Sequence, residues 1–165
     1  MGHYKANSIN SHNFNLTSDD QQIGALVYSK WYSFNADILL ADGSKYELKS
    51  KDLWDSKIEL KDSSQNTLLE FKMGWKGILI KCFFDTKETT YLLKLKGLFS
   101  NKFTLIDAEK TELLVAETDF KWSKISYDYH IETTPVFEQL GNSKLFLLTL
   151  LHCVNYYMNS IATGG

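Results

Sequence analysis

Apolar and polar residues alternate with period two through most of the first 140 residues, and this pattern constrains the fold more than any other feature. Successive side chains of a β-strand point to opposite faces, so the alternation predicts strands with one apolar face. Turn-forming Gly, Asp, Asn and Ser recur between the alternating segments. We predict about twelve strands: His3–Ser8, Asn13–Thr17, Ile23–Lys30, Phe34–Leu40, Lys45–Lys51, Ser56–Asp62, Thr67–Met73, Gly77–Phe84, Thr90–Gly97, Lys102–Asp107, Glu112–Phe120 and Lys124–Thr133.

The connections between these strands are mostly of hairpin length, as at Ala41–Ser44 and Gly74–Lys76. Short connections without intervening helices favour an antiparallel meander. A sheet of about twelve strands with one apolar face tends to close, because closure removes its unpaired edges. Pro135, the single proline, follows the last predicted strand and disturbs no ladder.

The alternation divides the side chains between two faces. One predicted face is apolar: Ile58, Leu60, Leu69, Phe71, Met73, Ile78, Ile80, Phe84, Tyr91, Leu93, Leu95, Phe103, Leu105, Leu113, Val115, Ile125, Tyr127, Tyr129 and Ile131. The other is polar: Lys57, Glu59, Lys61, Glu70, Lys72, Lys81, Lys94, Lys96, Lys124, Asp128, His130 and Glu132. We expect the apolar set to face the interior.

One long helix is predicted at the end of the chain, at about residues 143–162, after the helix-starting Asn142 and Ser143. Its side chains are apolar almost all round, except for a narrow polar strip formed by His152, Asn155 and Asn159. This strip needs hydrogen-bond partners, which lipid does not supply. We therefore expect a helix enclosed by protein rather than an integral membrane segment.

A closed barrel of about twelve strands leaves a lumen wider than its own side chains fill. The apolar C-terminal helix is the natural filler. The predicted fold is therefore mainly β, a closed antiparallel barrel of about twelve strands that encloses a hydrophobic α-helix. We expect one domain over residues 1–165, because no repeat, low-complexity stretch or linker divides the chain.

A chain with these elements resembles a known family. A twelve-stranded antiparallel barrel threaded by a hydrophobic C-terminal helix is the architecture of the tubby C-terminal domain, shared by the LURP-one-related proteins and proposed for the phospholipid scramblases. The resemblance covers the chain from Tyr4 to about Ala162. It rests on the number and order of the elements, without a short motif.

The resemblance implies different functions in different branches of that superfamily. In tubby-like proteins it implies phosphoinositide binding by basic residues. In scramblase-like proteins it implies an acidic, calcium-binding segment just before the final helix. The corresponding stretch here, IETTPVFEQLGN, contains only Glu132 and Glu138, too few oxygen ligands for a calcium site. The chain thus departs from the calcium-activated pattern.

Residues suited to catalysis or metal binding are scarce. His152 and Cys153 are adjacent, but neighbouring helical residues point about 100° apart and do not form a nucleophile–base pair. His3, His12 and His130 lack zinc-ligand spacing. We therefore expect no enzyme, cofactor or metal, with an enzyme assembled from distant segments as a remaining alternative.

The N-terminal segment and the cysteines indicate the compartment. The polar N-terminus lacks the apolar core of a signal peptide, and Ala6 stands where a myristoylation signal needs Ser or Thr. Cys82 and Cys153 are expected to be buried thiols rather than a disulfide, although a barrel and its enclosed helix can bring them close. We expect a cytoplasmic protein.

Charge is unevenly distributed along the chain. All 18 basic residues are lysines. Because lysine lacks the planar fork of arginine, sequence-specific nucleic-acid binding is not expected. Residues 44–102 contain 12 lysines and 8 acidic residues, against 6 and 12 in the rest of the chain.

One set of lysines is a candidate binding surface on the outer face of neighbouring strands: Lys57, Lys61, Lys72, Lys81, Lys94 and Lys96. One interpretation is a solvated surface of mixed charge. The other is a surface that binds anionic lipid headgroups or an acidic protein. The sequence therefore favours a non-catalytic barrel that binds a membrane surface or a protein, with a carrier of small hydrophobic ligands as the alternative.

Overall fold

The computed structural model describes residues 1–10, 13–30, 35–51, 57–84, 87–97, 100–123 and 125–162. The described residues form twelve strands and two helices: β1 (Gly2–Asn10), β2 (Asn13–Ser18), β3 (Gln21–Tyr28), β4 (Ala36–Leu40), β5 (Lys45–Ser50), β6 (Lys57–Lys61), β7 (Thr67–Gly74), β8 (Gly77–Cys82), β9 (Thr89–Leu95), β10 (Lys102–Ile106), β11 (Glu112–Lys121), β12 (Ser126–Thr133), α1 (Pro135–Glu138) and α2 (Ser143–Ala162). Each predicted strand overlaps one of these. The predicted strand positions Phe34, Ser56 and Lys124 lie outside the described residues.

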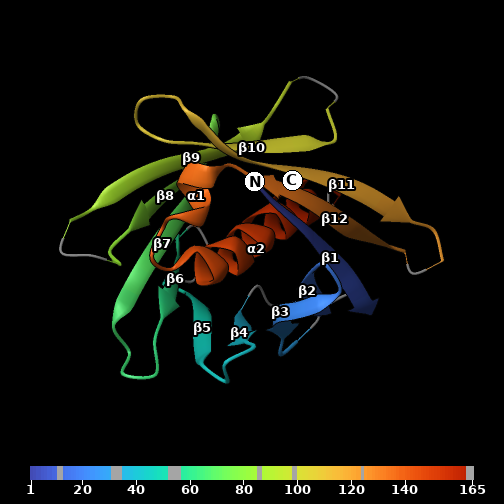
Figure 1. Ribbon diagram of the computed structural model, residues 1–165, viewed down its shortest axis with the longest axis horizontal. Coiled ribbons are helices and arrows are strands. Elements are labelled where there is room, and N and C mark those ends of the chain that lie inside the picture. The colour runs from blue at the N-terminus through green and yellow to red at the C-terminus, as the bar shows by residue number, and fades with distance from the viewer. Residues whose placement is uncertain are drawn as a thin grey trace.

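The strands form a closed barrel (Figure 1). Each strand pairs antiparallel with its neighbours in sequence, and β12 returns to pair with β1, where Tyr4 lies opposite Ile131. An even number of strands allows this closing pair to be antiparallel as well. The predicted closed antiparallel barrel is confirmed.

Most residues predicted to face inward are buried, including Ile58, Leu60, Phe103 and Tyr129. Val115 is an exception, because a β-bulge changes the register. Leu105 pairs with Leu114 but Ile106 pairs with Glu112, so Leu113 is the extra residue. Both Leu113 and Leu114 are buried, and Val115 therefore faces outward opposite Glu132.

Three further side chains differ in burial from what their predicted face implied. Ile125 was predicted inside, but it lies in the β11–β12 turn at φ 50° and is exposed. Glu59 lies on the outer face as predicted, but it is buried there, with its carboxylate between Lys51 and Lys61. Asp128 was predicted exposed, but it is buried and accepts hydrogen bonds from the amide and hydroxyl of Ser8.

The long helix α2 contacts strands on several sides of the barrel. His152 lies against Tyr28 of β3 and Phe71 of β7, and Tyr157 lies against Phe103 of β10. Figure 1 shows α2 within the ring of strands. Gly24 permits its closest approach, because a Cβ atom there would lie 2.7 Å from Leu148 Cδ1.

The short helix α1 was not predicted. Thr134 caps it by accepting a hydrogen bond from the Phe137 amide, and Pro135 occupies the first turn, where no amide proton is needed. Glu138 then joins α1 to the barrel and to α2: Tyr4 donates to it at 2.9 Å, and the Lys144 ammonium lies at 3.4 Å. Burial raises the pKa of Glu138, but these contacts outweigh it and lower that pKa below its ordinary value.

Candidate functional site

The barrel lumen is the first place to look for a ligand site, and α2 fills it. Most of its apolar side chains are almost fully buried, among them Leu147, Leu150, Leu151 and Val154, each at most 1% exposed. Phe146 also packs against the barrel wall, with its ring centroid 5.2 Å from that of Tyr91. A carrier of hydrophobic ligands needs a hollow lumen, so this packing argues against the carrier alternative.

The polar strip of α2 is largely satisfied by tyrosines that point into the barrel. Tyr28 Oη lies 2.6 Å from His152 Nδ1, and Asn155 Nδ2 donates to the same Tyr28 oxygen at 3.1 Å. Tyr129 donates to Asn155 Oδ1 at 3.3 Å. Because the Tyr28 oxygen accepts from Asn155, its own proton is available for donation to His152 Nδ1.

Burial lowers the pKa of His152 to about 3, so the imidazole is neutral at ordinary pH. Among the described residues, none forms a hydrogen bond with its Nε2. Asn159, predicted in the same buried strip, is instead exposed, because the last turns of α2 are less covered; its amide donates to the Asn155 carbonyl. His152 and Asn155 are therefore structural residues of the core.

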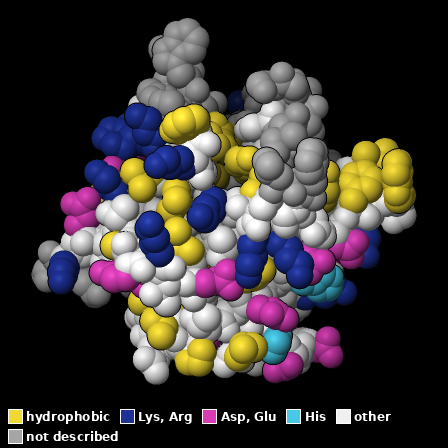
Figure 2. All heavy atoms as spheres, turned by 90° about the horizontal axis from the view of Figure 1, so that it is seen from above, with side chains coloured by type: hydrophobic (Ala, Val, Ile, Leu, Met, Phe, Trp, Pro, Cys, Tyr) yellow, Lys and Arg dark blue, Asp and Glu magenta, His cyan; other side chains and the backbone are white. Residues whose placement is uncertain are grey.

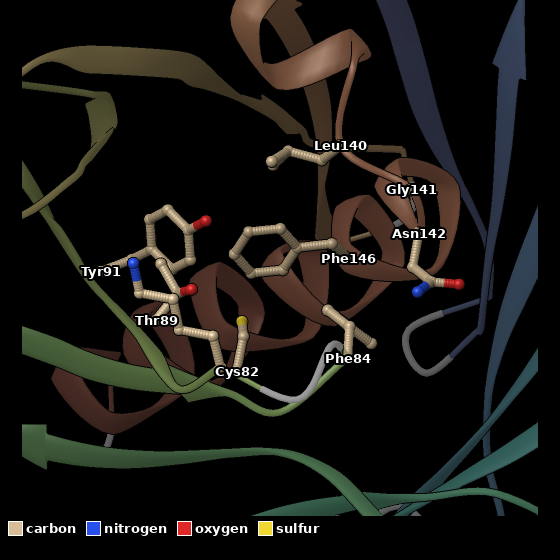
Figure 3. A pocket seen from close by; sticks show the side chains of 9 residues that line it. Cys82, Phe84, Thr89, Tyr91, Leu140, Gly141, Asn142 and Phe146 are labelled. Atoms are coloured by element: carbon tan, nitrogen blue, oxygen red, sulfur yellow. The ribbon is translucent and has the colours of Figure 1, made fainter.

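Both cysteines are buried and free, as predicted. Cys82 also lines a pocket of about 80 Å³ between the ends of β8 and β9 and the start of α2. Figure 3 shows Phe146 reaching from α2 toward Tyr91, with Leu140 above. The pocket holds only a few water molecules. Burial raises the pKa of the Cys82 thiol to about 12, so the thiol is not an activated nucleophile.

The six predicted lysines do not form one uniform surface. Four of them have acidic partners: Lys57 with Glu70 at 3.1 Å, Lys61 with Glu59 at 3.5 Å, Lys81 with Glu88 at 3.7 Å, and Lys96 with Glu112 at 2.9 Å. Within the described part of the chain, Lys72 and Lys94 form no ion pair, and both are exposed. Figure 2 shows lysines and acidic side chains interspersed on the face over β9 and β10, with the lysines gathered toward one side.

The two ends of the barrel differ in the residues that connect the strands. In an antiparallel meander, alternate connections lie at the same end. The β2–β3, β4–β5, β6–β7, β8–β9 and β10–β11 connections share the end at which α1 lies and α2 begins, which we call the aspartate end. The other six connections share the opposite end, which we call the tryptophan end.

Acidic residues predominate at the aspartate end. Its described connections contain seven acidic residues and two lysines: Asp19, Asp20, Asp42, Asp62, Glu88, Asp107 and Glu109, with Lys87 and Lys110. Three of these side chains stabilise the turns in which they lie. Asp42, Asp62 and Asp107 each accept a hydrogen bond from the amide two residues on, at 2.9 to 3.0 Å. The acidic residues at these three turns are explained by turn geometry.

Lysines and large apolar side chains mark the tryptophan end. Its described connections contain Lys30, Lys51, Lys76 and Lys96, and no acidic residue in the part of them that the structure describes. Four large apolar residues are exposed at this end: Ile9 at 59%, Trp75 at 97%, Trp122 at 85% and Ile125 at 79%. The aspartate end exposes Met1 and Val136 but, among its described residues, no aromatic side chain.

Comparisons with protein-family models, with curated proteins and with solved structures gave no match to this chain. The described residues contain no group of three His, Cys, Asp or Glu side chains placed to hold a metal ion, and no helix among them is long and apolar enough to span a membrane. The class that the structure defines is a closed twelve-stranded antiparallel barrel with a C-terminal helix. Its candidate site is the tryptophan end.

Proposed function

We propose that this chain is a non-catalytic binding domain that attaches to anionic lipid headgroups at a membrane surface, with the cytoplasmic leaflet as its target. The separation of charge between the two ends carries this proposal. By sequence, the connections of the tryptophan end contain five lysines and two acidic residues, whereas those of the aspartate end contain two lysines and eight acidic residues. The resemblance to tubby-like barrels, in which basic residues bind phosphoinositides, agrees with it.

Three exposed lysines surround the β7–β8 hairpin, and in the described part of the chain they form no ion pair: Lys72, Lys76 and Lys94. Lys76 lies in the turn itself. A Cβ atom on Gly77 would lie 3.0 Å from Lys94 Cβ, so the Lys94 stem is beside this turn. Lys72 pairs across the sheet with Lys57, and like charges directly opposite each other cost stability. Because Lys57 is paired with Glu70, the charge of Lys72 is the one left for an external anion to bind.

Replacing Lys72, Lys76 and Lys94 by Gln tests the proposal. Each lysine near an anionic bilayer contributes about 1 kcal/mol, so the triple variant should lose about 3 kcal/mol, or about 100-fold in partitioning onto vesicles at low salt. Sedimentation with vesicles of phosphatidylcholine and phosphatidylserine, at low and near-physiological salt, measures this. Binding should weaken as salt rises.

The matched control changes Lys45, Lys87 and Lys110 to Gln at the aspartate end. Both triple variants have the same net charge, so only the position of the lost charges differs. The control should bind like wild type. Equal losses of vesicle binding in the two variants would show non-specific attraction. Absence of wild-type binding at low salt would contradict the proposal and make a protein partner the better candidate.

The absence of arginine leads to a further expectation about which lipid headgroups the protein distinguishes. Lysine is a point charge and does not clamp phosphate bidentately. Vesicles with phosphatidylserine and vesicles with a phosphoinositide, matched for total surface charge, should therefore bind the protein within about threefold of each other. A strong preference for one phosphoinositide would indicate a built headgroup pocket instead.

A further inference from the structure

We propose that the tryptophan end inserts Trp75, Trp122 and Ile125 into the interfacial region of an anionic membrane, so that the barrel docks end-on. This inference rests on the proposed function and adds the orientation and the apolar contact residues. Membrane interfaces are enriched in tryptophan because its ring is apolar while its N–H still reaches water or headgroups.

The β7–β8 hairpin presents Trp75 at its tip. Its turn has two residues, Trp75 and Lys76, between the paired Gly74 and Gly77. Gly77 has φ 139°, and a Cβ atom there would lie 2.4 Å from the Leu93 carbonyl oxygen, so this turn depends on glycine. The turn itself needs no tryptophan, and the Trp75 ring is almost fully exposed.

The β11–β12 hairpin presents a second apolar tip. The Trp122 ring stands edge-on to Phe120 at 4.9 Å, and Phe120 in turn lies 5.2 Å from Tyr127. These contacts hold Trp122 without covering it. Ile125, in the same turn, is also exposed. Figure 1 shows this hairpin projecting from the barrel, and Figure 2 shows apolar atoms projecting at the same edge of the molecule.

The arrangement favours a bilayer over a protein partner. Protein interfaces concentrate their binding energy in a contiguous, well-packed patch. Here the two tips belong to hairpins separated by β9 and β10, so Trp75 and Trp122 do not form one patch. A fluid interface accommodates separate insertions, and Lys76 beside Trp75 places a cation where anionic headgroups would lie.

The variants Trp75→Ala and Trp122→Ala test insertion, with Val136→Ala as the control at the aspartate end. Partitioning is measured onto vesicles of phosphatidylcholine with 30% phosphatidylserine and onto phosphatidylcholine alone, at low and near-physiological salt. Salt screens the lysines but not apolar contacts. We therefore expect Trp75→Ala to lower partitioning about tenfold at near-physiological salt, and Val136→Ala to leave it unchanged.

Tryptophan fluorescence gives a second readout. Wild-type emission should shift to shorter wavelength on anionic vesicles and be quenched by lipids brominated near the headgroup. Trp31 and Trp54 also contribute and lie outside the described residues, so the signal is the difference between wild type and each variant. Trp75→Ala keeps the fold because the ring is exposed; circular dichroism verifies this for both variants.

The outcomes separate this inference from the proposed function. Binding at low salt that neither tryptophan variant changes, without quenching, would overturn insertion and leave charge-driven binding standing. Binding to neutral vesicles that Trp75→Ala abolishes would support insertion and overturn the anionic target. If the protein partitions onto vesicles under no condition, both the inference and the proposed function are overturned. A dimer in solution that Trp75→Ala dissociates would also overturn both.

Discussion

His152 shows how one buried side chain couples stability to pH. Its ring lies on α2 between Tyr28 and Phe71, and burial lowers its pKa from 6.5 to about 3. Between these pH values the unfolded chain binds one more proton at this residue than the folded protein does. The free energy of unfolding therefore falls as pH drops below about 6.5, by at most about 1.4 kcal/mol per pH unit from this group.

We expect the variant His152→Gln to lose this part of the pH dependence. Between pH 7.5 and pH 5, its free energy of unfolding should fall by about 2 kcal/mol less than that of wild type. Urea denaturation at the two pH values measures this. Equal falls in wild type and His152→Gln would mean that His152 titrates freely in the folded protein.

Gly77 and Gly74 form a matched pair at the same hairpin. Gly77→Ala places a Cβ atom 2.4 Å from the Leu93 carbonyl oxygen at φ 139°, whereas the nearest atom to a Cβ on Gly74 is 3.4 Å away. We expect Gly77→Ala to lower the free energy of unfolding by about 2 kcal/mol or more, and Gly74→Ala by less than about 1 kcal/mol. Chemical denaturation decides this. Similar losses would show that the turn relaxes around the added methyl group.

At the scale of elements, α2 supplies many of the buried side chains of the core. Leu150 is 1% exposed within the barrel, so Leu150→Asp would bury an unpaired carboxylate, at a cost of at least about 4 kcal/mol. Asn159→Asp adds the same charge at an exposed position of the same helix and should cost less than about 1 kcal/mol. Thermal melts followed by circular dichroism compare the two. A cooperative melt of Leu150→Asp near the wild-type temperature would contradict the enclosed helix.

Removing α2 tests the same element more severely. A chain that ends at Gly141 loses the apolar side chains that fill the lumen, so we expect it to aggregate and to show no cooperative unfolding. The full chain should stay in solution without detergent. A truncated chain that remains monomeric and melts cooperatively would show that the strands close without the helix.

The sequence predicted the elements well because each strand has its own alternation. The sequence did not predict local deviations within strands. The bulge at Leu113 reversed the assignment of Val115, since a single extra residue changes which side chains face inward. Asp128 was placed outside because alternation does not reveal that Ser8 covers it. The four-residue helix α1 is too short to give a periodic signal.

At the scale of the whole molecule, the candidate site was only partly predictable. The alternation within strands predicted which lysines lie on the outer face. It did not predict their acidic partners, which depend on strand register, as with Lys57 and Glu70. The tryptophan end was missed, although Trp75 and Lys76 were placed correctly in a hairpin. Its signal was present: taking every second connection of a predicted meander groups the four tryptophans at one end and most of the connection aspartates at the other, with Asp52 and Asp55 as the exceptions. That step needs the order of all the strands in the meander, which the alternation within one strand does not contain.

The orientation of the barrel on a membrane is the central claim, and hydrogen exchange tests it most directly. Amide exchange measured by mass spectrometry, with and without phosphatidylserine-containing vesicles, reports which segments the membrane covers. We predict slower exchange at residues 74–77 and 121–126 and no change at 41–44, 62–66 and 107–111. Slower exchange at the aspartate turns, or along the outer faces of β6 to β9 without the hairpin tips, would contradict end-on docking.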